Sequence, residues 1–129
     1  MACPKEIIVA YRHLYRQCLK VVNYSAPSRH VLLRILRSSF ESGSGHDFDT
    51  RKIANTLLFL RRASASTGLE HKIVKNIILI RYWEQLRIKK DTRMISGQTA
   101  AEIHLRRTAL AHFNSTLMLL NESLGTCLR

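Results

Sequence analysis

The sequence is poor in the residues that interrupt helices. Its 129 residues include 5 glycines and 2 prolines. Proteins rich in β-structure need many such residues at their turns, so this scarcity, beside many Leu, Ile, Ala and Arg residues, predicts an all-α fold. The length fits one domain, because typical domains run to about 100–200 residues.

Acidic residues are also scarce, and the balance of charge is strongly positive. The chain has 9 Asp and Glu against 21 Lys and Arg, a net charge of +12. Such an excess is typical of a protein with an anionic partner, which leaves nucleic acid, an anionic membrane or an acidic protein open. The three cysteines, Cys3, Cys18 and Cys127, lack the spacing of a metal site or a CxxC pair. We therefore expect reduced structural thiols.

Patterns typical of catalysis and of membrane spans are missing. There is no glycine-rich phosphate loop and no histidine pair at metal-ligand spacing. Asp47 and Asp49 precede a predicted helix, where an acidic side chain is usually a cap. We therefore predict no enzyme, no catalytic or metal-binding residues and no directly bound cofactor. Without an apolar run of about 18 residues we predict no transmembrane helix. The first residues have the basic, amphipathic composition of an uncleaved import signal.

Hydrophobic periodicity predicts five helices. They run from residue 4 to about 24, 27 to about 40, 49 to about 64, 69 to about 90 and 97 to about 124. Pro4 suits a first turn, Asp49 an N-cap and Gly125 a C-cap. We predict one domain over 1–129, with a three-helix core at 4–66. Residues 69–129 would form an extension of two long helices that pair as an antiparallel hairpin.

A short motif lies in the first predicted helix. Leu14, Tyr15 and Arg16 belong to a basic amphipathic run, and Arg37 and Phe40 follow near the end of the second helix. With a third helix after them, these residues resemble the LYR-motif (complex I LYR-like) family, small basic helical adaptor proteins of mitochondria. The N-terminal half looks most like a small member found on precursors of the mitochondrial large ribosomal subunit. The extended form also resembles an uncharacterised group of fungal LYR-like proteins.

The resemblance implies a fold, a partner and a site. Family members are antiparallel three-helix bundles that bind the mitochondrial acyl carrier protein in the matrix, and the carrier's acyl-4′-phosphopantetheine enters between the helices. Acidic carrier side chains would meet arginines, and the acyl chain would need an apolar lining. The implied carrier-binding residues are Arg12, Leu14, Tyr15, Arg16, Arg34, Arg37, Phe40 and Arg51, and the implied acyl lining is Leu14, Leu19, Leu36, Phe40 and Leu57.

The resemblance ends at the third helix, so we expect the last two helices to dock a client. The basic pairs Lys89–Lys90 and Arg106–Arg107 are candidates for contacts with RNA or another client. The positive charge favours the mitochondrial ribosome, with the protein as a large-subunit assembly factor or as a subunit. A respiratory complex or an iron–sulfur system is the alternative client. A helical RNA-binding protein with an accidental Leu-Tyr-Arg tripeptide is the rival from another class.

Overall fold

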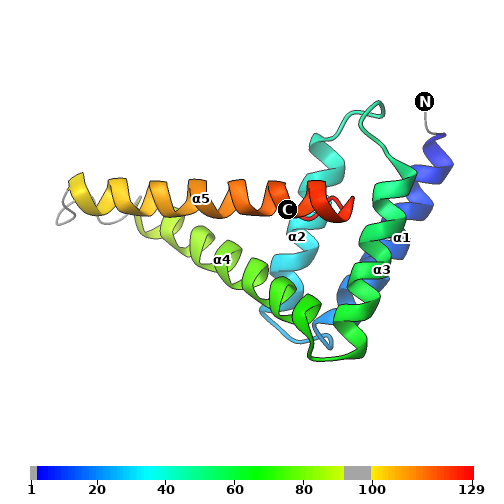
Figure 1. Cartoon of the computed structure of the whole chain (residues 1–129), viewed down its shortest axis with the longest axis horizontal. Helices are drawn as coiled ribbons and strands as arrows, with labels where there is room; N and C mark the ends of the chain where they lie inside the picture. The colour runs from blue at the N-terminus through cyan, green and yellow to red at the C-terminus, as the bar shows by residue number, and fades with distance from the viewer. Residues whose placement is uncertain (1–2, 92–99) are drawn as a thin grey trace.

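The computed structural model describes residues 3–91 and 100–129, with the backbone alone for 87–91. This part of the chain contains five α-helices and no strand, which confirms the all-α prediction (Figure 1). The helices are α1 (Pro4–Val21), α2 (Ser28–Ser42), α3 (Thr50–Ala65), α4 (Leu69–Asp91) and α5 (Ala100–Leu124). None of the described helices is long and apolar enough to cross a membrane.

The helix ends follow the local signals of the sequence. Pro4 lies in the first turn of α1, and the Asp49 carboxylate accepts hydrogen bonds from the backbone N–H groups of Arg51 (2.9 Å) and Lys52 (3.4 Å). Gly125 follows α5 with a φ of 64°, in the left-handed region that glycine adopts without strain. These predictions are confirmed. Pro27 is the N-cap of α2 and does not lie inside it, which corrects the predicted start. The predicted start of the last helix, near 97, lies outside the described residues.

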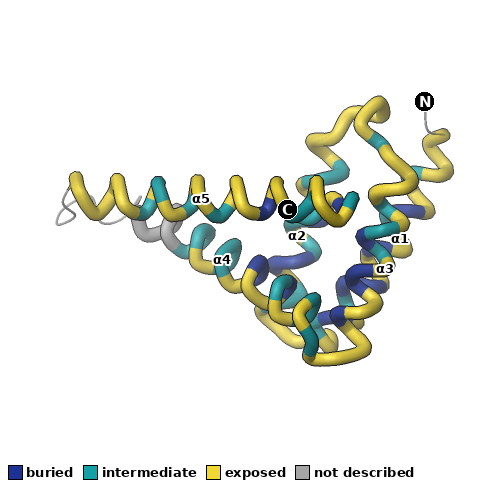
Figure 2. The backbone as a smooth tube through the Cα atoms, in the orientation of Figure 1, coloured by how far each residue is buried: buried dark blue, intermediate teal, exposed yellow. Residues whose placement is uncertain are grey.

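Four helices build the hydrophobic core. α1 packs on α2 and α3, and α4 packs on α3 and α2. Figure 2 shows the buried stretches gathered on these helices, while α5 is largely exposed. The core residues share an inward position on their helices: Leu14, Cys18, Val21, Val31, Leu32, Leu36, Phe59, Leu60, Ala63, Val74 and Ile78.

The inward face of α3 differs from the sequence-based expectation. The apolar pattern of the sequence predicts an inward face of Ile53, Leu57, Leu58 and Leu60 with Phe59 beside it, but Leu58 is 48% exposed and Phe59 is buried. Thr56, Phe59, Leu60 and Ala63 follow 3-4-7 spacing and turn together toward α1 and α4. Leu58 lies outside this face, so the prediction was wrong by one position around the helix.

α4 belongs to the core through one face. Val74 and Ile78 are buried with residues of α1, α2 and α3. Leu79 and Trp83 lie on the opposite face of α4 and are about half exposed, at 52% and 53%. α4 and α5 run in opposite directions, as expected of a hairpin (Figure 1). α4 nevertheless packs against α2 and α3. The division into a 4–66 core and a 69–129 extension stays a prediction, but the core as built includes α4.

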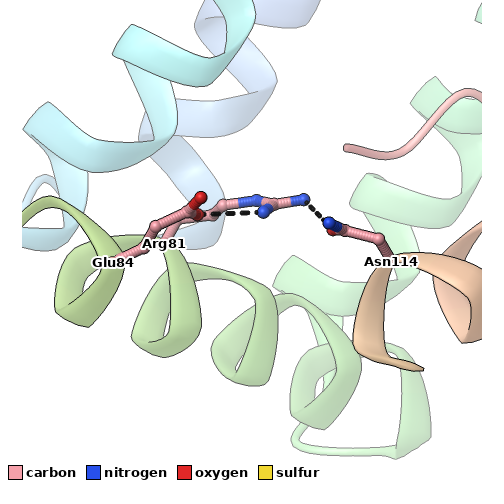
Figure 3. Close-up of polar contacts among 3 residues, drawn as sticks. All are labelled: Arg81, Glu84 and Asn114. Atoms are coloured by element: carbon pink, nitrogen blue, oxygen red, sulfur yellow. Dashed lines mark hydrogen bonds and ion pairs between the residues drawn. The ribbon is translucent and has the colours of Figure 1, made fainter. Parts of the chain in front are cut away.

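A polar bridge joins α4 to α5. Arg81 donates to the Glu84 carboxylate at 3.0 Å and to the Asn114 side-chain oxygen at 2.9 Å (Figure 3). Its guanidinium group also lies 5.5 Å from the centre of the Phe113 ring, at cation–π distance. Leu117 is the buried residue of α5 among those described. α5 therefore extends beside the packed helices with most of its surface in solvent.

We predict that Ile78→Ala destabilises the whole protein, because it opens a cavity in the shared core. The free energy of unfolding should fall by about 2–5 kcal/mol. Leu79→Ala is the matched control, since the neighbouring side chain is half exposed; it should change stability by less than about 0.5 kcal/mol. Urea denaturation followed by circular dichroism measures both. Equal, small losses for the two variants would show that α4 is not part of the cooperative core.

Candidate functional site

The Leu-Tyr-Arg tripeptide spreads its side chains around α1. Successive residues of an α-helix are about 100° apart, so neighbours point in different directions. Leu14 is buried at 4% exposure, Tyr15 is 37% exposed, and Arg16 is exposed. The Tyr15 ring lies 6.1 Å from that of Tyr11, which in turn meets Phe40 of α2 edge to face at 5.2 Å. The structure thus joins the tripeptide to Phe40 through an aromatic contact between α1 and α2.

Most of the predicted arginines are free to meet a partner. Arg12, Arg16, Arg37 and Arg51 are exposed, and within the described residues their side chains have no hydrogen bond or ion pair. Arg34 differs, because its guanidinium group donates a hydrogen bond to the Gln85 side chain of α4. Arg34 is thereby held toward α4. Four unpaired guanidinium groups on α1, α2 and α3 make this part of the surface attractive to an anionic partner.

Two neighbouring cavities lie beside Leu14. The inner cavity has a volume of about 90 Å³ and reaches α4, and the outer cavity, of about 330 Å³, lies along the α2–α3 connection. Both are lined by Leu14, Ser39, Phe40, Cys127 and Arg129. Together they connect the buried member of the tripeptide to the surface.

The polar groups of the inner cavity are satisfied within the protein. The Ser39 hydroxyl donates to the Ile35 carbonyl at 2.8 Å, and the Thr56 hydroxyl donates to the Lys52 carbonyl at 2.8 Å. No buried side-chain nitrogen or oxygen in the described residues lacks a partner. A ligand therefore gains little by hydrogen bonding there, and the space suits an apolar chain.

The structure separates the expected acyl lining into two groups. Leu14, Leu36 and Phe40 line the inner cavity, whereas Leu19 and Leu57 line neither of these cavities. Leu19 is five residues after Leu14 and therefore lies about 140° away from it around α1. On α3 the neighbouring residue Thr56, and not Leu57, is buried and lines the inner cavity.

Other lining residues were missed by sequence reasoning. They are Cys18, Leu32, Ile35, Ser39, Thr56, Leu60, Val74, Ile77 and the segment 127–129. The apolar pattern of α4 was visible in the sequence, but no sequence signal placed the segment after α5 at this site.

A third cavity lies where the α1–α2 turn meets α4. Its volume is about 410 Å³, and its lining includes Val22, Pro27 and Leu79 with the basic side chains of His71 and Lys75. None of the residues that the sequence predicted for a site lines it. The cavities beside Leu14 are therefore the better candidate site.

The basic pairs expected to contact a client are only partly described. Arg107 is exposed on α5 and Arg106 is half-buried there. Lys89 and Lys90 lie outside the residues whose side chains are described. No group of three or more His, Cys, Asp or Glu residues in the described chain could hold a metal ion.

Cys18 is the buried thiol of the site. Burial raises the pKa of Cys18 from an ordinary 9.0 to about 12, because the thiolate loses its hydration. The side chain lines the inner cavity and is part of the core. It behaves as a small apolar residue, which confirms the structural role expected for it.

One comparison with known proteins gave a relative. The chain is 29% identical over 100 residues to the UPF0593 mitochondrial protein C806.05 of Schizosaccharomyces pombe, and the match covers 76% of this chain and 78% of that protein. The chain is thus similar to a mitochondrial protein, whose printed name gives no activity. No family model matches the chain, and no solved structure matches it.

We predict that Cys18 makes the protein less stable at alkaline pH. The unfolded thiol ionises near 9.0, while the folded thiol stays protonated up to about 12. The free energy of unfolding should therefore fall as pH rises above about 9. Urea denaturation at pH 8 and pH 10 should show a smaller fall for Cys18→Ala than for the wild type, because alanine does not ionise. The same fall in both proteins would contradict the prediction.

Proposed function

We propose that this protein is a non-enzymatic mitochondrial adaptor that binds an acylated acyl carrier protein and connects it to a larger complex. The observation that carries the proposal is the position of Leu14. It lines both neighbouring cavities, and it belongs to a helix whose Arg12 and Arg16 are exposed and unpaired within the described part of the chain. An apolar space inside a bundle whose surface carries exposed arginines suits a ligand that is apolar at one end and acidic at the other.

The acyl chain is proposed to enter through the outer cavity and end in the inner one. Leu14 and Phe40 line both, so they would contact the chain along its path. Burial of each methylene stabilises the complex by about 0.8 kcal/mol. Because the polar groups of the inner lining are already bonded, the chain enters without leaving a donor or acceptor unpaired.

The carrier protein is proposed to bind over the exposed arginines. Arg12, Arg16, Arg37 and Arg51 have no partner within the described part of the chain, so pairing with carboxylates or the phosphate of the carrier breaks no existing bond. Such charges also speed the encounter of the two proteins. Arg34 is set apart by its hydrogen bond to Gln85, and we assign it a secondary role.

The location and the client follow from separate arguments. Similarity to a mitochondrial protein of S. pombe supports the mitochondrion, and the proposed carrier partner supports the matrix. The net charge of +12 supports a client rich in phosphate, for which the mitochondrial large ribosomal subunit is our choice. The exposed surface of α5, including Arg107, is available for that contact.

We predict that Arg16→Glu combined with Arg37→Glu abolishes recovery of the carrier protein. The double change replaces two attractive contacts with repulsive ones. Co-expression with acyl carrier protein, affinity purification and native mass spectrometry should give a one-to-one complex for the wild type. Arg106→Glu with Arg107→Glu is the matched control, since it changes the net charge equally on α5. If both double variants recover the carrier as well as the wild type does, carrier binding at the tripeptide is wrong.

The same control pair tests the client. We predict that Arg106→Glu with Arg107→Glu weakens sedimentation with the large ribosomal subunit in sucrose gradients and reduces the salt sensitivity of that association, because fewer phosphates are neutralised. Carrier recovery should be unchanged. If the wild type sediments with respiratory complexes and not with the ribosome, the ribosomal client is wrong while the carrier proposal stands.

A further inference from the structure

The segment that follows α5 folds back along its own helix. Asn121 holds it in place: its side-chain nitrogen donates to the Leu128 carbonyl at 2.6 Å, and its side-chain oxygen accepts from the Leu128 N–H and the Thr126 hydroxyl, both at 2.9 Å. Figure 1 shows the end of the chain turned back under α5 toward α2. One side chain of α5 thus fixes the path of residues 126–128.

The segment is also bonded to α3 across a long separation in sequence. The Cys127 N–H donates to the Thr56 hydroxyl at 3.1 Å, and the Cys127 sulfur lies 3.2 Å from the same oxygen. The Asn55 side chain donates to the Gly125 carbonyl at 3.1 Å. Gly125 has a φ of 64°, which favours glycine, and a Cβ there would lie 3.0 Å from the Asn55 nitrogen.

This segment forms part of the wall of the candidate site. Cys127 and Arg129 line both cavities beside Leu14, and Leu128 lines the inner cavity and packs against the core. Leu128 thereby places an apolar side chain next to the space assigned to an apolar ligand, where a chain longer than the inner cavity would meet it. Cys127 and Arg129 are exposed, so water can replace their hydrogen bonds on release, whereas Thr126 is buried at 4% exposure.

We propose that residues 126–129 are a displaceable plug of the cavity, and that an entering acyl chain takes the place of Leu128. The assignment of an acyl chain rests on the function proposed above. Asn121 is then a positioning residue: it lines none of the three cavities and acts through the segment that it holds. Because the plug also ties the end of α5 to α3, its release loosens α5 when the cavity fills.

The test compares two asparagines of α5. Asn121→Ala removes the bonds that hold the plug, while Asn114→Ala removes a bond to Arg81 and leaves the plug intact. The probe is decanoyl-pantetheine, titrated by calorimetry into the full chain. If the plug competes with the ligand, Asn121→Ala should bind the probe several-fold more tightly than the wild type does, and Asn114→Ala should bind it equally well. Unchanged or weaker binding to Asn121→Ala overturns the plug.

A second variant tests whether the ligand displaces Leu128 or whether Leu128 stays in place as part of the cavity wall. Leu128→Ser should tighten binding if the leucine is displaced, and weaken it if the leucine stays and contacts the chain. Hydrogen exchange gives an independent readout: the Cys127 and Leu128 amides are bonded in the free protein and should exchange faster when the probe is bound. Slower exchange on binding would count against displacement.

The outcomes also distinguish the plug from the proposed function. If the wild type and all variants bind neither the probe nor the acylated carrier, the proposed function fails and the plug with it. If the wild type binds both, and loosening the segment brings no gain in affinity, the plug is wrong and the adaptor function stands. Circular dichroism of each variant establishes that the comparison is made between folded proteins.

Discussion

Packing of α4 against the first three helices is the interaction on which the rest of the structure depends. Val74 and Ile78 join the same buried cluster as Leu14 and Leu60. Val74 also forms part of the wall of the inner cavity, so the helix that closes the core leaves a space beside Leu14. Ser39 and Thr56 are small and bond to their own helices, and they do not fill that space. The cavity is thus a product of how the core closes, and the segment after α5 is placed to cover it.

Charge imposes the second constraint. With a net charge of +12, the basic side chains greatly outnumber the acids available to pair with them; Arg81 is one that does form an ion pair, with Glu84. Solvent screens the remaining repulsion, yet each free guanidinium group on α1 to α3 would be better placed beside an anion. Large apolar side chains are also exposed, with Trp83 at 53% and Leu105 at 67%. Both features are consistent with the complex-forming role proposed above.

The proposed site and the plug place two demands on the same few residues. Thr56 accepts a hydrogen bond from the Cys127 backbone and donates one to its own helix, so this contact with α3 involves no charge, while the Arg129 guanidinium donates to the Ser42 hydroxyl at 3.4 Å. In this proposal an entering ligand competes with Leu128 for space in the inner cavity. The displacement loosens α5, which would change the affinity of a partner that binds α5. By linkage, a client that prefers the loosened α5 would favour the acyl-filled state to the same degree. Carrier loading and client docking would then be coupled through residues 126–129.

The sequence by itself determined the five helices, the cap at Asp49, the turn at Gly125 and the exposure of Arg16 and Arg37, because these depend on local periodicity and local hydrogen bonds. It did not determine which neighbour faces inward where two apolar residues adjoin, as Leu58 and Phe59 show. Only the tertiary structure determined where the inner cavity lies and which segment, residues 126–129, covers it. Thr56 and Cys127 are in contact although 71 residues separate them in the sequence. Hydrophobic periodicity within one helix cannot predict a contact between segments so far apart.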